Sequence, residues 1–138
     1  YAAHCRIETA PYPGVAALLR TLRTQGRKLA IVSNKPDEAV RTLRADFFAD
    51  AVQIAVGETA AIRRKPAPDM LLAAMEQLGA DPDKTVFVGD SEVDIATARA
   101  ADLPCISVLW GFRDRDVLER AGAQQFAADI AQLQALLG

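Results

Sequence analysis

The stretch Thr85-Val-Phe-Val-Gly-Asp-Ser-Glu-Val-Asp94 joins an apolar run to the start of a helix. The run from Thr85 to Val88 predicts a buried strand, and the small residues from Ile95 to Ala101 predict a helix directly after it. In an open α/β sheet, ligands bind at the carboxyl ends of the strands. Asp90 stands at such an end and Asp94 follows one helical turn later. Their carboxylates therefore predict a site for Mg²⁺, which prefers hard oxygen ligands.

A purely structural explanation stays open for the same residues. Ser91 and Asp94 fit the S-x-x-D pattern of a capping box, in which the two side chains bind the backbone at the start of a helix. This pattern alone does not separate a cap from a metal site. Polar residues upstream in the chain favour the site.

Strand-like and helix-like segments alternate along the chain. The predicted strands are Leu29–Val32, Val52–Val56, Thr85–Val88, Cys105–Leu109 and Gln125–Ala127. The predicted helices are Val15–Gln25, Pro36–Ala45, Pro68–Leu78, Val93–Ala101, Asp114–Ala121 and Ile130–Leu137. Such alternation predicts an α/β fold, a doubly wound parallel sheet with helices on both faces. Right-handed crossovers would bring every strand-to-helix loop to the same edge of the sheet.

Prolines and glycines mark the expected ends of the helices. Pro36 and Pro68 fit the first helical position, where a missing N–H costs nothing. Gly26, Gly79 and Gly122 follow helices, where a glycine can take the left-handed conformation that ends a helix.

Composition limits the classes of partner. The 138 residues suffice for one domain with a real core. The net charge of −2 gives no reason to expect nucleic acid or an anionic membrane as a partner. The apolar runs are too short to span a bilayer. Cys105 lies in an apolar strand and is expected to be a small core residue, so a reduced, cytoplasmic setting is the default expectation.

The segment Leu29-Ala-Ile-Val-Ser-Asn-Lys35 ends a predicted strand with Ser33 and Asn34. A hydroxyl together with backbone N–H groups at the start of a helix can bind a phosphate oxygen. Ser33 and Asn34 are therefore candidate substrate-binding residues. The alternative is that one of them only caps the following helix.

The loop Arg63-Arg-Lys-Pro-Ala-Pro-Asp69 places three cations before a helix. Its two prolines stiffen the backbone, so a cation can be held in place at a lower entropic cost. Lys65, next to Pro66, is the candidate for neutralising the charge of a phosphoryl group. The alternative is a solvated basic loop.

Taken in chain order, these residues resemble the haloacid dehalogenase superfamily of phosphatases. The matching pieces are the strand ending in Ser33-Asn34, the Lys65-Pro66 element and Gly89-Asp-Ser-Glu-Val-Asp94. Three further segments look most similar to the phosphoglycolate phosphatase branch: Pro13-Gly-Val15, Lys65-Pro-Ala-Pro-Asp69 and Trp110-Gly-Phe-Arg113.

The resemblance implies a role for each matching residue. Asp90 and Asp94 would hold Mg²⁺, Ser33 would bind the transferring phosphoryl group, and Lys65 would steady its charge. The implied substrate is a small phosphorylated metabolite. Phosphoryl transfer mainly needs such positioning and charge neutralisation. Trp110 is expected to pack at the end of its strand, whereas Phe112 and Arg113 would lie near the ligand edge, with Arg113 a possible substrate contact.

The nucleophile of that family is an aspartate in a D-x-D-G-T pattern, which is absent from the sequence. Asp81-Pro-Asp83 precedes a strand and would face the opposite edge from Asp90. Asp114-Arg-Asp116 opens a helix and no apolar strand ends on it. We therefore expect no nucleophile among these residues, and a chain that is inactive alone.

In the family, the nucleophile strand lies between the strands that end at Ser33 and Asp90. We expect residues 14–138 to be the partial core domain of a longer enzyme, with 1–13 as a lead-in from its cap domain. The two strands would then either pair directly or, as we favour, flank an inserted segment. Domain swapping or homodimerisation is one source of such a segment.

Other functions compete with this interpretation. A receiver-type signalling domain also uses an aspartyl phosphate, Mg²⁺ and a lysine, but its acidic pair comes first and its lysine last. An inactive fragment or binding module is consistent with the missing nucleophile. Within the superfamily, a pyrophosphatase or a sugar-phosphate mutase stays open, whereas a true dehalogenase would leave Asp90 and Asp94 without a purpose.

Overall fold

The computed structural model describes residues 14–111 and 113–138. Its strands are β1 (Ala30–Pro36), β2 (Ile54–Glu58), β3 (Phe87–Gly89), β4 (Cys105–Val108) and β5 (Gln125–Ala127). Its α-helices are α1 (Val15–Thr24), α2 (Asp37–Leu43), α3 (Asp69–Leu78), α4 (Glu92–Ala100), α5 (Arg115–Arg120) and α6 (Ile130–Leu137). None of these helices has the length and apolar character needed to cross a bilayer.

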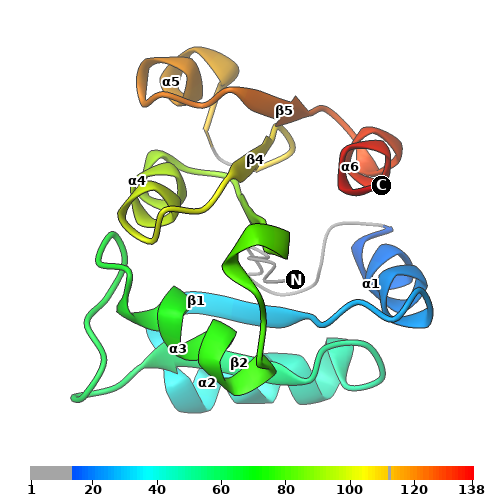
Figure 1. Cartoon of the computed structure of the whole chain (residues 1–138), viewed down its shortest axis with the longest axis vertical. Coiled ribbons are helices and arrows are strands. Elements are labelled where there is room, and N and C mark those ends of the chain that lie inside the picture. The colour runs from blue at the N-terminus through cyan, green and yellow to red at the C-terminus, as the bar shows by residue number, and fades with distance from the viewer. Residues whose placement is uncertain (1–13, 112) are drawn as a thin grey trace.

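The strands form two parallel groups. β1 pairs with β2 through Ala30↔Ile54 and the following residues. β3, β4 and β5 pair in that order, with Val88 opposite Ile106 and Ser107 opposite Phe126. Figure 1 shows the two groups one above the other. The predicted parallel α/β fold is confirmed.

The described residues do not form one continuous sheet. β1 belongs to the two-stranded group and β3 to the three-stranded group. Direct pairing of the strands that end near Ser33 and Asp90, one of the two expected arrangements, is therefore wrong. The expected lead-in, residues 1–13, lies outside the described part of the chain.

Helices cover both faces of the strands, as predicted. Successive residues of the β1 segment point to opposite faces: Leu29 and Ile31 belong to one apolar core, Ala30 and Val32 to the other. Residues of α1 and α6 complete the first core, and residues of α3 and α4 complete the second. Figure 1 shows α1 beside α6 on one side of the strands. Burial on both faces explains why the strand sequences are apolar without alternation.

The predicted elements are present, with shifted ends. Pro36 is the last residue of β1, with φ −53° and ψ 142°, and α2 begins at Asp37. The expectation that Pro36 opens the helix is wrong by one residue, because the proline ring fixes φ but leaves ψ free to stay extended. A π-helical turn, Arg44–Phe48, and a 3₁₀ turn, Pro82–Lys84, were not predicted. Gly26, Gly79 and Gly122 have the positive φ expected at helix ends.

Candidate active site

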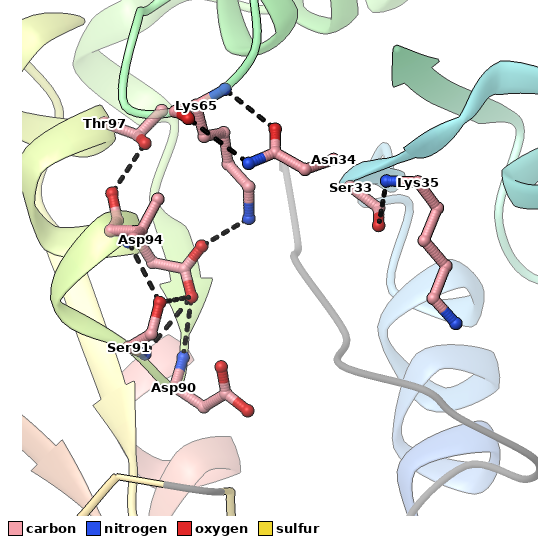
Figure 2. Close-up of polar contacts among 9 residues, drawn as sticks. Ser33, Asn34, Lys35, Lys65, Asp90, Ser91, Asp94 and Thr97 are labelled. Carbon is pink, nitrogen blue, oxygen red and sulfur yellow. Dashed lines mark hydrogen bonds and ion pairs between the residues drawn. The ribbon is translucent and has the colours of Figure 1, made fainter.

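A buried ion pair joins two distant parts of the chain. Lys65 Nζ lies 2.6 Å from Asp94 Oδ1, and the two side chains are only 5% and 1% exposed. The Lys65 ammonium also lies 5.8 Å from the centre of the Phe87 ring. A buried charge needs a charged or hydrogen-bonding partner. The ion pair therefore holds the lysine side chain next to the carboxyl end of β3 and the first turn of α4. Figure 2 shows the lysine reaching down onto Asp94.

The second oxygen of Asp94 organises the turn after β3. Asp94 Oδ2 accepts hydrogen bonds from the backbone N–H of Asp90 at 3.0 Å and of Ser91 at 3.3 Å, and from the Ser91 hydroxyl at 3.1 Å. The Ser91 hydroxyl in turn accepts from the Asp94 N–H, so the predicted capping box is confirmed. Both carboxylate oxygens of Asp94 are thus engaged by protein donors.

Two glycines leave room for the two carboxylates. A Cβ built on Gly111 would stand 2.3 Å from Asp90 Oδ2 and 2.4 Å from Asp90 Cβ. A Cβ on Gly89 would stand 2.3 Å from Asp94 Cβ. Asp90 itself is 3% exposed at the carboxyl end of β3. The missing side chain of Gly111 therefore lets the loop after β4 lie against the Asp90 carboxylate.

The end of β1 approaches Lys65 through Asn34. Asn34 Oδ1 accepts from the Lys65 backbone N–H at 2.8 Å, and Asn34 Nδ2 donates to the Lys65 carbonyl at 3.2 Å. The neighbouring Ser33 hydroxyl accepts from the Lys35 N–H at 3.2 Å. In Figure 2 Asn34 points toward Lys65, and the Ser33 side chain points away from Lys65.

The structure thus brings Asn34, Lys65, Asp90 and Asp94 into one connected set of contacts. Ser33 lies at the same strand end and is linked to this set through the backbone of Asn34. Gly111 was not predicted as a site residue. Its role, leaving room for the Asp90 carboxylate, becomes visible only when its loop is seen to approach Asp90 in three dimensions. Trp110 packs against the first apolar core, as expected.

Arg113, a possible substrate contact from the sequence, pairs with Glu92. Its Nε lies 3.1 Å from each carboxylate oxygen of Glu92, the first residue of α4. Hydrogen bonding to the Glu92 backbone lowers the pKa of this carboxyl, and Arg113 lowers it further. Phe112, expected near the same edge, lies outside the described residues.

The donor set fits a magnesium ion that keeps most of its water. Within residues 14–111 and 113–138, no cluster of three or more His, Cys, Asp or Glu side chains could enclose a metal. Mg²⁺ in phosphoryl-transfer sites typically binds one or two carboxylates and completes its shell with water and substrate phosphate. Asp90 offers such a carboxylate, which itself fills the room left by Gly111, whereas the oxygens of Asp94 already bind Lys65 and the helix start. A hard cation at Asp90 and a buried ammonium nearby can together neutralise a phosphoryl group.

Comparison with known proteins identifies the family of the chain. The haloacid dehalogenase-like hydrolase family matches residues 1–102. The phosphoglycolate phosphatase of Rhodospirillum rubrum is 37% identical over 128 residues, covering 92% of this chain and 53% of that protein. A candidate phosphoglycolate phosphatase from Lactobacillus delbrueckii subsp. bulgaricus has a crystal structure that superposes with a TM-score of 0.91 at 44% identity, covering 96% of this chain and 56% of the other.

A second crystal structure carries a ligand of the expected kind. A haloacid dehalogenase family hydrolase from Deinococcus radiodurans, solved with bound phosphate and sodium, superposes with a TM-score of 0.82 at 29% identity, covering 93% of this chain and 59% of the other. This chain belongs to the haloacid dehalogenase-like hydrolases. The chain spans about half the length of the curated relatives it matches.

Proposed function

We propose that the native protein containing this chain is a Mg²⁺-dependent phosphatase of small phosphate monoesters, with 2-phosphoglycolate as the first candidate substrate. The observation that carries the proposal is the buried Lys65–Asp94 pair beside Asp90, in a chain of this family. The substrate is suggested by the Rhodospirillum rubrum relative, which is named a phosphoglycolate phosphatase.

Each residue would have a separate task. Asp90 would hold the Mg²⁺, which supplies Lewis-acid neutralisation of phosphoryl oxygens when bound. Lys65, held by Asp94, would bind another oxygen of the same phosphoryl group. Ser33, whose side chain points away from Lys65 and accepts from the Lys35 N–H, would have to turn to donate its hydroxyl hydrogen to a third oxygen. We expected Asp94 to be a metal ligand too; because both its oxygens bind protein donors, we now propose that it holds Lys65 and the Asp90 backbone instead.

The reaction would proceed in two displacements. A carboxylate oxygen of the D-x-D-G-T pattern would attack phosphorus, the bond from phosphorus to the ester oxygen would break, and the departing oxygen would take a proton from the second aspartate of that pattern. Water would then attack the aspartyl phosphate and return a proton to that second aspartate, releasing inorganic phosphate and restoring the attacking carboxylate. The D-x-D-G-T aspartate that would attack is absent from these 138 residues, so the proposal concerns the native protein.

A substrate panel tests the proposal. The native protein would be assayed with Mg²⁺ against 2-phosphoglycolate, hexose phosphates, pyrophosphate and a chlorinated carboxylic acid. We expect kcat/KM for 2-phosphoglycolate to exceed that for the others by about tenfold or more. Preferred hydrolysis of pyrophosphate would indicate a pyrophosphatase instead. Isomerisation of a hexose phosphate without phosphate release would indicate a sugar-phosphate mutase instead. Absence of phosphate release from every ester would reject the phosphatase.

A further inference from the structure

We infer that Asn34 is a positioning residue, which sets the place of Lys65 by binding its backbone. This inference refines the proposed function and rests on it for its catalytic consequence. The geometry on which it depends belongs to the chain itself. The sequence alone suggested that Asn34 contacts substrate.

The contact uses both polar groups of one amide side chain. Asn34 Oδ1 accepts from the Lys65 N–H, and Asn34 Nδ2 donates to the Lys65 carbonyl. The side chain thereby satisfies both backbone groups of a single residue, as a neighbouring strand would. Asparagine is suited to this task because its short, planar amide carries a donor and an acceptor together. Aspartate lacks the donor, and serine is too short and offers one hydroxyl.

The loop that carries Lys65 needs such a restraint. Three consecutive cations occur there, and their exposure differs sharply: the side chains of Arg63 and Arg64 are 74% and 63% exposed, that of Lys65 only 5%. Arg63 pairs with Asp69 and Arg64 with Glu58, both on the outside. Asn34 binds the backbone of the one residue whose cation is buried. It therefore fixes which of the three cations turns inward.

The effect extends to the other strand group. Lys65 binds Asp94, and Asp94 binds the backbone N–H of Asp90. A chain of contacts thus runs from the end of β1, through the Lys65 loop, to the end of β3. Loss of the Asn34 contact should first disturb Lys65, and should leave the strands themselves in place.

Amide hydrogen exchange in this 138-residue chain tests the contact without any assay of activity. In Asn34→Ala we expect the Lys65 amide to exchange about tenfold faster or more, since one hydrogen bond that protects it is gone. The amides of Ile31, which faces β2, and of Ile106, which faces β3, should keep their protection, which shows that the strands remain. Thr59→Ala is a matched control: it removes another side chain that holds an amide of the same loop, that of Ala61, and should not affect Lys65. Unchanged Lys65 exchange in Asn34→Ala would overturn the inference.

A double-mutant cycle in the native protein tests whether Asn34 acts through Lys65. Asn34→Ala alone should lower kcat/KM about 10- to 100-fold, as a misplaced group does. On a Lys65→Met background it should add less than about threefold, because the residue it positions is already gone. Two effects that multiply fully would mean that Asn34 contacts the substrate directly, and would overturn the inference. If the native protein releases no phosphate at all, the proposed function fails, and the exchange measurement still decides whether Asn34 holds Lys65.

Discussion

Lys65 and Asp94 lie 29 residues apart in the sequence, yet their charged atoms are 2.6 Å apart inside the protein. One comes from the loop before α3 and the other from the first turn of α4. The pair joins the loop to the helix that follows β3, and it is the most deeply buried ion pair among the described residues. Much of the site depends on it.

The first prediction concerns the stability that this pair provides. Asp94→Asn removes the negative charge beside the buried Lys65 ammonium and keeps the size of the side chain. We expect the free energy of unfolding, measured by urea denaturation, to fall by about 3–5 kcal/mol, because breaking a buried pair leaves a charge in a poor environment.

The double variant Lys65→Met/Asp94→Asn provides the control. It removes both charges, so it should be clearly more stable than the sum of the two single effects predicts. A loss of less than about 0.5 kcal/mol in Asp94→Asn, typical of a surface position, would contradict the burial of this pair.

The second prediction concerns Gly111. In Gly111→Ala the new Cβ would collide with Cβ and the carboxylate of Asp90, so either the carboxylate or the loop must move. We expect the Kd for Mg²⁺, measured by calorimetry, to rise about tenfold or more, because a ligand moved out of place loses most of its contribution.

Gly26→Ala is the control for the cost of changing a glycine. Gly26 has φ +85° and open space around it, so alanine there strains the backbone far from the site. This variant should lose stability and keep its Mg²⁺ affinity. Equal affinities in Gly111→Ala and the unchanged protein would remove Gly111 from the site.

The third prediction concerns the pKa of Glu92. Hydrogen bonding to its own backbone lowers this pKa and Arg113 lowers it further, so Arg113→Ala should raise the value seen in an NMR titration without restoring it fully. Because the pKa is lowered in the folded state, the carboxylate stabilises the fold above the unfolded pKa. That contribution is lost as the pH falls through the lower, folded value. An unchanged titration in Arg113→Ala would show that the pair does not persist in solution.

The fourth prediction concerns the thiol of Cys105. Burial raises the pKa of Cys105 to about 12, with a further contribution from the charge of Asp94. Since the thiolate is the reactive form, iodoacetamide should modify Cys105 very slowly at pH 8 in the folded protein and rapidly in urea. The experiment uses the Cys5→Ser variant, so that Cys105 is the only cysteine that can be modified. Rapid modification of the folded protein would contradict the burial of β4.

Much of the fold was predictable because each element leaves a strong local pattern. The apolar runs before Ser33 and Asp90 are buried on both faces, and the glycines after the helices have the expected positive φ. The boundary at Pro36 was less predictable, because proline suits both a strand end and a helix start.

The candidate site was predictable only as a set of residues. The sequence predicted that Lys65, Asp90 and Asp94 lie together, and the structure places them in contact. The sequence could not show that both oxygens of Asp94 bind protein donors. Nor could it show that Asn34 binds the Lys65 backbone or that Gly111 approaches Asp90. Such contacts depend on how separate loops meet in space, and no local pattern encodes them.

The central claim is that Asp90 binds a Mg²⁺ ion on which phosphate ester hydrolysis depends. Initial rates of phosphate release by the native protein would be measured against Mg²⁺ concentration after removal of metal by EDTA, for the unchanged protein, Asp90→Asn and Asp102→Asn. Asp102 is an exposed aspartate after α4 with φ 59°, a conformation that asparagine accepts, so its variant removes an equal charge away from the site. We predict that Mg²⁺ restores activity to the unchanged protein and to Asp102→Asn, whereas Asp90→Asn stays at least about 100-fold lower at every concentration. Full activity in EDTA, or near-normal turnover by Asp90→Asn at saturating Mg²⁺, would contradict the claim.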